Sequence, residues 1–580
     1  MRPPGTVHRA VDGANRADRR PVLFAGFPLQ AWAFAIRVWL ALLVALYVSF
    51  WLELEAPASA ALTVTVLALP TRGQGLEKAA FRVVATILGV AASIAIVGLL
   101  VQTEMLILAA FAAWMGLCVY AARLLDGNRA YAAALCAITV AFIAVQQIDT
   151  PQNVFQAGLE RGAAIFVGIL AVALVNDVLA APDYHPAIAA RLENLHRQVA
   201  AYAWRAVRGE PIPPDEAARL LRDITALRPE VASLTAESDG GQARSAAGRA
   251  AMVCLVSELA TARALARQAS SLASAVRDRI ISDLDGMDGA DPPSSTTTGL
   301  SWMTAELVRR DRDVRSALDA LRRGAYPDQA WRAPLYRSHR LAANNGIKAA
   351  LYFALAAIFL AAAGWPAAEA CVAFVGILIG ISATVPDARA FATLALVVAP
   401  LSCLLTGLLE FVVLDGVSDF PLLAIGLAPF VIGLALLMTL PNPALSTIAR
   451  TGLIFMIALL APSNPQTYDP QAFLFACLFL CLAVVLLFVT QHLIPPLSNE
   501  GTLRVLLAEA HRDLDRPTGR RRRHLAPEES LFRDAARIGQ IEAAAGNAPE
   551  TRRFVESAMA CFDRAAALLP KGRNDDPHVQ

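Results

Sequence analysis

The chain has 580 residues and a net charge of +2, and 56% of its residues are hydrophobic while only 17% are charged. Soluble domains carry about 25% charged residues, so this composition, with a mean hydropathy of +0.49, excludes an ordinary soluble protein. The near-neutral charge argues against a nucleic-acid partner. The apolar residues are gathered into blocks, which indicates an integral membrane protein.

Twelve apolar stretches approach the roughly 20 residues that a membrane-spanning helix needs. They form two sets of six: 31–52, 55–70, 83–101, 104–122, 130–147 and 162–181, then 346–363, 366–385, 390–410, 421–440, 449–462 and 471–493. The second and the eleventh are short. We predict helices throughout, because strand alternation is absent and lipid does not tolerate open strand edges. The first stretch is longer than the apolar part of a signal peptide, so it is expected to remain as an uncleaved span.

Polar segments flank and separate the two sets. Residues 182–345 are rich in Ala, Leu and Arg in a helical pattern, which favours a small cytosolic helical bundle. Four helices are expected there, near 186–208, 213–234, 242–285 and 300–323. Residues 495–580 are predicted to be a second helical tail, and residues 1–30 a short cytosolic segment. The two transmembrane sets accordingly occupy 31–181 and 346–494.

Basic residues fall at every other short loop, whereas the alternate loops are mostly acidic. The basic set is Arg72, Lys78, Arg82, Arg123, Arg129, Arg389 and Arg450; the acidic set is Glu53, Glu55, Glu104, Asp149, Glu410, Asp415, Asp419 and Asp469. Arg161 is the exception on the acidic side. Because Lys and Arg collect in cytoplasmic loops, both termini and the middle segment are predicted to be cytoplasmic. Two sets that start on the same side imply a parallel duplication, and Pro57 and Pro366 open corresponding spans.

The sequence carries no catalytic or nucleotide-binding signature, so we expect no enzyme activity and no ATP-driven pump in this chain. Any transport would be secondary, channel-like or coupled through another protein. The eight cysteines are scattered and lack zinc or redox spacing. We therefore predict no disulfide, no metal and no cofactor.

Charged residues inside membrane spans are candidate functional residues, because their insertion costs at least about 2.5–3.5 kcal/mol. Arg37 is expected to pair with an anionic substrate or to reach the cytosolic headgroups. Glu369 is a candidate for proton uptake or an interfacial carboxylate. Lys348 would attract anions or anchor its helix at the interface, and Asp177 would act in a proton relay or cap its helix.

A short motif carries a family resemblance. Pro57 opens an apolar helix, Gly73-Gln-Gly75 lies in a basic loop, and Arg82-Val-Val-Ala-Thr-Ile-Leu-Gly89 starts the next span. This pattern resembles the fusaric acid resistance / aromatic acid exporter family of bacterial inner-membrane proteins, although Ala85 stands where glycine is expected and no tryptophan follows the proline. The plan of six spans, helical domain, six spans and tail agrees with that family over residues 25–580.

The resemblance implies efflux of aromatic carboxylic acids or related organic acids, driven by the proton gradient, at the bacterial inner membrane. It also implies a periplasmic membrane-fusion adaptor, and we expect a homo-oligomer in the lipid bilayer. Arg37 and Arg82 would raise the local concentration of an anionic substrate; Arg82 serves equally as a positive-inside anchor. Two alternatives remain open: an organic-anion channel, and a membrane scaffold that transports nothing.

Overall fold

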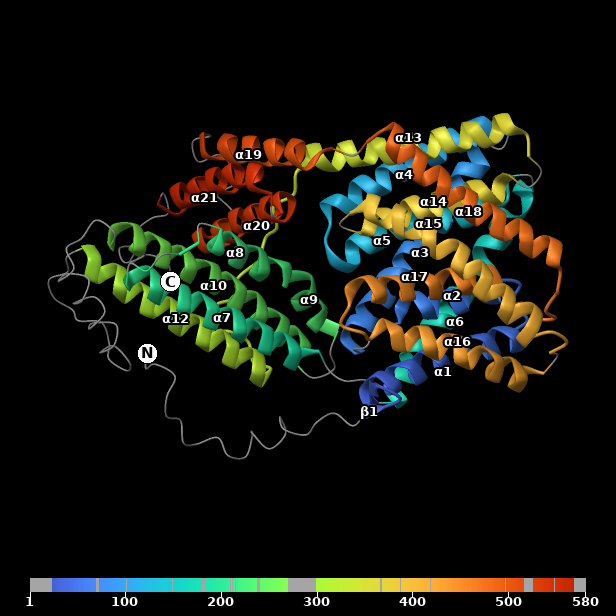
Figure 1. The fold of residues 1–580 in the computed structure, drawn as a ribbon, viewed down its shortest axis with the longest axis horizontal. Coiled ribbons are helices and arrows are strands. Elements are labelled where there is room, and N and C mark those ends of the chain that lie inside the picture. The colour runs from blue at the N-terminus through green and yellow to red at the C-terminus, as the bar shows by residue number, and fades with distance from the viewer. Residues whose placement is uncertain are drawn as a thin grey trace. The chain divides into compact units, whose positions relative to one another are not determined.

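The computed structural model describes residues 23–567 except 69–71, 101, 149, 180–183, 209, 211, 214, 237–239, 270–298, 366–367, 386, 418, 496, 516–524 and 547. Asp149 and Pro366, the side chain of Arg72 and most of the N-terminal segment lie outside this part. The chain divides into a membrane unit, Asp18–Pro182 with His339–Pro496, and a helical unit, Asp183–Ser338 with Leu497–Gln580 (Figure 1). Apart from the short strand pair β1 (Leu23–Phe24) and β2 (Phe27–Pro28), the regular elements of the described residues are helices. The prediction of an all-α polytopic membrane protein is confirmed.

Twelve helices of the membrane unit match the twelve predicted stretches one for one. They are α1 (Leu29–Trp51), α2 (Pro57–Leu67), α3 (Arg72–Leu100), α4 (Glu104–Leu124), α5 (Gly127–Val140), α6 (Val154–Val178), α13 (His339–Ala363), α14 (Ala368–Thr384), α15 (Ala388–Leu408), α16 (Phe420–Met438), α17 (Pro443–Leu460) and α18 (Pro470–Leu493). Within the described residues, ten helices are long and apolar enough to cross a membrane, while α2 and α14 are shorter. A five-residue π-helix extends α5 (Ala141–Val145) and another extends α15 (Leu409–Val413).

The helix of the eleventh stretch begins six residues before the short apolar run 449–462. Its helix α17 has 18 residues and begins at Pro443, because the side chain of Asn442 accepts hydrogen bonds from the backbone N–H of Ala444 at 3.0 Å and of Leu445 at 3.5 Å. A side-chain oxygen at this position satisfies donors that the first turn leaves unpaired. The cap therefore starts the helix before the apolar run that the sequence analysis used.

The packing within the first set is repeated in the second. Helices α1 to α6 correspond in order to α13 to α18. In the first set, α1, α2 and α6 pack on one another, α3 packs on α5 and α6, and α4 packs on α5. In the second set, α13, α14 and α18 pack on one another, α15 packs on α17 and α18, and α16 packs on α17. Two pairs of equivalent contacts join the sets. Helix α4 packs on α13, and its counterpart α16 packs on α1; helix α5 packs on α14, and its counterpart α17 packs on α2. This exchange is the approximate two-fold relation expected of duplicated halves in one bundle.

The two equivalent interfaces between the sets are tightly packed. At the interface of α4 with α13, a Cβ added to Gly346 would lie 2.5 Å from the carbonyl oxygen of Gly116. The rings of Phe111 and Phe353 pack edge to face there, with their centres 4.5 Å apart. At the second, the indole of Trp39 donates to the carbonyl of Ala424 at 3.1 Å. Small residues at such helix crossings permit close backbone approach.

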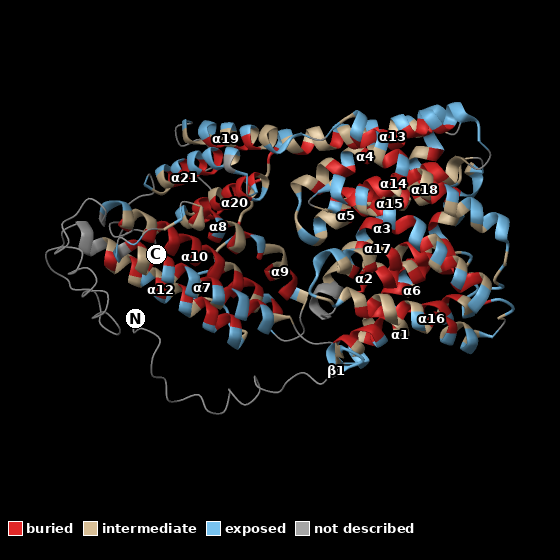
Figure 2. Ribbon diagram, viewed as in Figure 1, coloured by how far each residue is buried: buried red, intermediate tan, exposed pale blue. Residues whose placement is uncertain are grey.

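Large apolar side chains are exposed on the outside of the membrane unit. Leu99, Leu404 and Leu493 are 83%, 73% and 69% exposed, and Figure 2 shows pale exposed residues alternating with the red interior along these helices. Contiguous apolar surface of this kind is avoided in soluble proteins. These faces therefore suit contact with lipid, and the protein is a multi-pass membrane protein.

The helical unit combines the middle segment with the C-terminal tail. Its helices are α7 (His185–Arg208), α8 (Glu216–Ala226), α9 (Arg228–Ser233), α10 (Gly241–Ala269), α12 (Gly299–Arg323), α19 (Asn499–Asp515), α20 (Pro527–Ala545) and α21 (Arg552–Ala567). The four expected helices of the middle segment are represented by α7, α8 with α9, α10 and α12, although the expected stretch 270–285 lies outside the described residues. Helix α20 packs on α8 and α10, so the segments that the sequence analysis separated form one compact unit.

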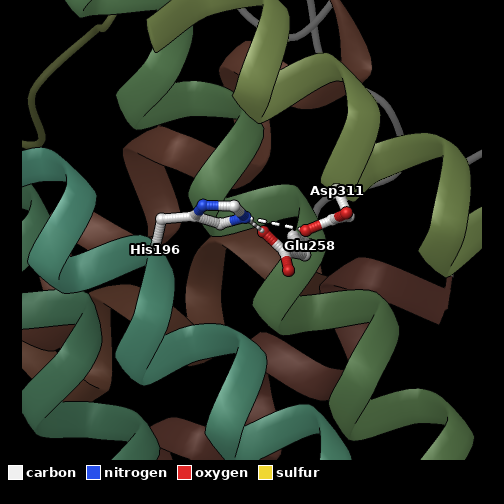
Figure 3. Close-up of side chains that lie close together, drawn as sticks. All are labelled: His196, Glu258 and Asp311. Carbon is white, nitrogen blue, oxygen red and sulfur yellow. Dashed lines mark hydrogen bonds and ion pairs between the residues drawn. The ribbon is translucent and has the colours of Figure 1, made fainter. Parts of the chain in front are cut away.

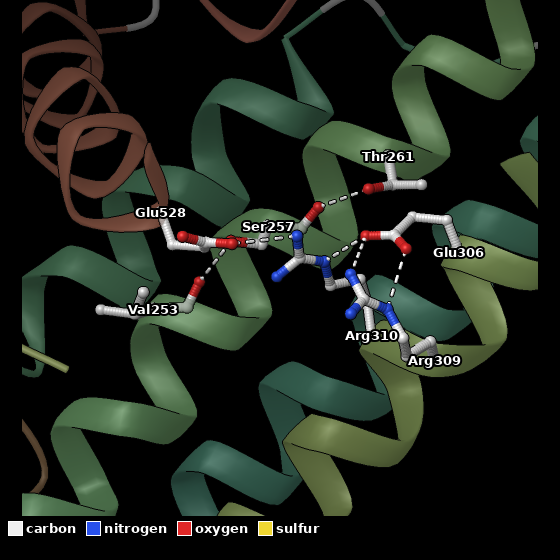
Figure 4. A network of polar contacts seen from close by, with 7 residues as sticks. All are labelled: Val253, Ser257, Thr261, Glu306, Arg309, Arg310 and Glu528. Atoms are coloured by element: carbon white, nitrogen blue, oxygen red, sulfur yellow. Dashed lines mark hydrogen bonds and ion pairs between the residues drawn. The ribbon is translucent and has the colours of Figure 1, made fainter. Parts of the chain in front are cut away.

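Charged side chains fix the tail to the middle segment. The guanidinium of Arg263 on α10 donates to both carboxylate oxygens of Asp563 on α21, at 3.1 and 2.9 Å. Figure 4 shows Arg310 of α12 between Glu306 of its own helix at 2.8 Å and Glu528 of α20 at 3.1 Å. Bidentate and networked pairs of this kind add geometric specificity to the docking.

Candidate functional site

A group of basic side chains surrounds Tyr131 of α5 inside the membrane unit. Lys78 and Arg82 lie one helical turn apart on α3 and therefore share a face. Arg82 is only 5% exposed, and its Nη1 donates to the Tyr131 hydroxyl at 2.8 Å. The Nζ of Lys78 donates to the carbonyl of Val66, near the end of α2, at 2.6 Å and lies 4.8 Å from the centre of the Tyr131 ring. The tight packing of α3 on α5 brings these groups together.

Two further arginines extend this group. Arg450 of α17 acts electrostatically on Lys78, and Tyr131 acts on Arg450. Arg82 acts on Arg161 of α6, whose guanidinium lies 3.7 Å from the centre of the Phe142 ring. We call Lys78, Arg82, Arg161 and Arg450 the basic cluster. Among the residues that the structure describes, no carboxylate forms an ion pair with any of the four.

The basic cluster is electrostatically suited to an anion. Bringing like charges together away from bulk water is unfavourable unless an opposite charge accompanies them. A site lined by one sign of charge with low-dielectric walls also concentrates ligands of the opposite sign. Tyr131 adds an aromatic face and a hydroxyl at the same place. The charges and the ring are of the kind that suit a small organic anion with an aromatic ring beside its carboxylate.

A buried carboxylate is the second feature of the membrane unit. Glu410 is 4% exposed, and its Oε2 has no hydrogen-bond partner among the described residues. It lies in the π-helical turn Leu409–Val413 that continues α15; such turns are rare and are often found at functional sites. Asp415 and Glu410 both act on Tyr468, whose pKa is raised mainly by burial, and Glu410 also acts on Cys477 of α18.

Most of these residues were not predicted from the sequence as functional candidates. Lys78 and Arg450 served only to orient the chain, and Glu410 was counted with the acidic loops because it ends an apolar stretch. The one signal that was available is Arg161, the single basic residue on the acidic side. Its exception to the orientation rule is explained by a place inside the bundle rather than in a loop.

Of the predicted candidates, Arg82 is a member of the basic cluster. Arg37 is buried on α1, where it is 7% exposed, and Asp177 is exposed in the last turn of α6. These three residues lie on three different helices.

The remaining two candidates lie on α13 and α14 of the second set. Lys348 is half-buried on α13, and its Nζ donates to the carbonyl of Pro495 at 2.8 Å. Glu369 is half-buried in the first turn of α14, where a carboxylate is favoured by the helix dipole. Both positions suit helix anchoring, and their predicted roles in transport stay predictions.

The comparisons with known proteins agree with this architecture. The sequence model of the Fusaric acid resistance protein family matches residues 31–282 and again residues 273–570. The chain belongs to this family. Two successive matches to one family model are consistent with the predicted duplication, as is the packing of α13–α18, which repeats that of α1–α6. The family resemblance stated from the motif around Arg82 is likewise confirmed.

Relatives in the family are similar over limited stretches. The uncharacterized transporter YdhK of Escherichia coli K12 is 27% identical over 177 residues, covering 30% of this chain and 26% of that protein. The p-hydroxybenzoic acid efflux pump subunit AaeB of Musicola paradisiaca Ech703 is 28% identical over 154 residues, covering 25% and 24%. The uncharacterized transporter GOX0755 of Gluconobacter oxydans 621H is 27% identical over 162 residues, covering 27% and 22%. The chain thus spans about a quarter of the length of these relatives. No solved structure matches it.

Proposed function

We propose that the chain is an efflux transporter that exports aromatic carboxylates, with p-hydroxybenzoate as the first substrate to test, across the bacterial inner membrane in exchange for protons. The observation that carries this proposal is the basic cluster around Tyr131, which offers positive charge and an aromatic ring and, among the residues that the structure describes, has no carboxylate in an ion pair with it. The name of the AaeB relative supports the choice of substrate.

The basic cluster would act as the substrate site. Arg82 is the proposed direct partner of the carboxylate, because its guanidinium is already held by the Tyr131 hydroxyl and its Nε has no partner among the described residues. Lys78 and Arg450 would keep the site positive. Arg37 is a proposed second anion-binding residue on α1. Asp177, Lys348, Glu369, a periplasmic adaptor and a homo-oligomer remain predictions.

Glu410 is the proposed proton carrier. A carboxylate buried in a membrane protein with one oxygen unpaired is favoured in its neutral form, because the charged form loses its hydration. Glu410 follows α15, at the end that the predicted orientation places on the periplasmic side. Lys78 and Arg82 lie near the start of α3, at the end that the same orientation places on the cytoplasmic side. A proton entering at Glu410 and an anion entering at the basic cluster would therefore approach from opposite sides, as an antiporter requires.

The test uses the purified full-length chain in proteoliposomes with labelled p-hydroxybenzoate. The wild type is expected to drive accumulation when a proton gradient is imposed and to lose it when an uncoupler collapses the gradient. Glu410→Gln is expected to reduce gradient-driven accumulation at least about tenfold. The variant should still exchange labelled for unlabelled substrate. Asp415→Asn, an exposed carboxylate in the next loop, is the matched control and is expected to behave as the wild type.

Each alternative has its own outcome in this assay. Large anion currents that follow the membrane potential and ignore the pH gradient would favour the channel. An absence of transport of any aromatic acid by correctly folded wild type would refute the exporter and leave the scaffold. Accumulation unchanged in Glu410→Gln would refute the proton-carrier role alone.

A further inference from the structure

Three chemically reactive side chains meet inside the helical unit. His196 of α7, Glu258 of α10 and Asp311 of α12 place one ligand atom each within 4.8 Å of the others (Figure 3). The Nε2 of His196 lies 2.8 Å from Oδ1 of Asp311 and 3.9 Å from Oε2 of Glu258. Helix α10 packs on both α7 and α12, and this packing brings the three residues together.

Glu258 is not satisfied by its protein neighbours. Its side chain is 1% exposed, and its Oε2, which faces the histidine, has no hydrogen-bond partner in the described part of the chain. A buried polar atom left unpaired costs about 1–3 kcal/mol, and more when charged. The carboxylate of Asp311 belongs to the same group of ligand atoms. A positive ion between the two carboxylates would give the unpaired Oε2 a partner and offset the repulsion between the two negative charges.

From these contacts we propose that His196, Glu258 and Asp311 bind a divalent transition-metal ion such as Zn²⁺. One imidazole nitrogen and two carboxylate oxygens suit Zn²⁺, Mn²⁺ or Fe²⁺, whereas Ca²⁺ takes six to eight oxygens. Ligands at about 2.1 Å in a tetrahedral site lie about 3.4 Å apart, so the three atoms need only small side-chain rotations to reach this spacing. Three protein ligands leave a position for water, and sites of this kind are built between facing helices of bundles.

The surroundings of Asp311 support this assignment. Its second oxygen, Oδ2, pairs with Arg315 one turn along α12 at 2.7 Å, which leaves Oδ1 turned toward His196. Partners of this kind outside the ligand set hold metal ligands in their orientation. The proposed site is independent of the proposed transport function, because it lies in the helical unit. It also replaces the expectation of no metal, which rested on cysteine spacing and did not consider one histidine and two carboxylates on three helices.

The experiment measures Zn²⁺ binding to the purified full-length chain in detergent after treatment with a chelator. Calorimetry gives the stoichiometry, and visible absorption of Co²⁺ reports the coordination. The wild type is expected to bind one Zn²⁺ per chain and to melt at a higher temperature with Zn²⁺ than without. Glu258→Gln and His196→Gln are expected to weaken binding by about 100-fold or more. His511→Gln is the control, because His511 and Cys561 lie 3.7 Å apart and form another pair of possible donors.

Several results would overturn the proposal. If the folded wild-type protein shows no saturable binding of Zn²⁺ or Co²⁺, the proposal is refuted and no variant is needed. Unchanged binding in Glu258→Gln and His196→Gln, or binding lost in His511→Gln, would place the metal elsewhere. If Glu258→Gln does not fold, Asp311→Asn serves as the second variant, and wild-type affinity in a folded Asp311→Asn protein would equally refute the site.

Discussion

Replacing Arg82 by glutamine should weaken substrate binding and leave the protein folded. If the guanidinium contacts the substrate carboxylate, its removal costs one hydrogen bond between charged groups, about 1.5–3 kcal/mol. Since about 1.4 kcal/mol corresponds to a factor of ten, KM for p-hydroxybenzoate should rise about 10- to 150-fold. Because Arg82 is 5% exposed, the effect should persist at high salt, where exposed charges are screened.

Two comparison variants separate substrate binding from structure and from general attraction. Tyr131→Phe removes the hydroxyl that accepts from Arg82 at 2.8 Å but keeps the charge, so KM should change by less than about threefold. Arg389→Gln removes an exposed arginine from the first turn of α15, on the side proposed to be cytoplasmic. Its KM should match the wild type at physiological salt, because a charge in water contributes little.

The assay is counterflow of labelled p-hydroxybenzoate in proteoliposomes at a range of substrate concentrations. Equal incorporation and melting temperature of the variants are checked first. A KM for Arg82→Gln within twofold of the wild type would refute the assignment of Arg82 to the substrate. An equal rise in Arg82→Gln and Arg389→Gln would show that the charges act only by general attraction.

Two further variants test the packing of each unit. Gly346→Ala puts a methyl group about 2.5 Å from a backbone oxygen of the facing helix. Thermal melting in detergent should therefore show that the stability of the protein falls by about 1–3 kcal/mol. The control is Gly433→Ala, which has open space around it and should leave the stability unchanged; equal melting of the two variants would contradict the close interface. Asp563→Ala leaves Arg263 without its bidentate partner and should destabilise the helical unit by about 1.5–3 kcal/mol in denaturant unfolding. Arg504→Ala, from an exposed pair, should change stability by less than about 1 kcal/mol, and a larger effect there than at Asp563 would refute the docking role.

The sequence by itself determined the helices of the membrane unit. Apolar runs of membrane length and the requirement that lipid-exposed backbone groups pair within a helix are local properties. A helix therefore lies at each of the twelve predicted stretches, and ten of these helices are long enough to cross a membrane. The motif from Pro57 to Gly89 led to the family only together with the plan of six spans, helical domain, six spans and tail. Where a helix started ahead of its apolar run, as at Asn442, the prediction was wrong, because a capping side chain rather than hydropathy sets that end.

Only the tertiary structure decided which charged residues meet. The basic cluster joins residues from α3, α6 and α17, and the proposed metal ligands come from α7, α10 and α12. Charge and burial depend on neighbours that lie far away in the sequence, so Glu410 looked like a loop residue until its π-helical turn placed it in the interior. Hydropathy gives the length of each helix, but the face that each helix turns to its neighbours follows from packing.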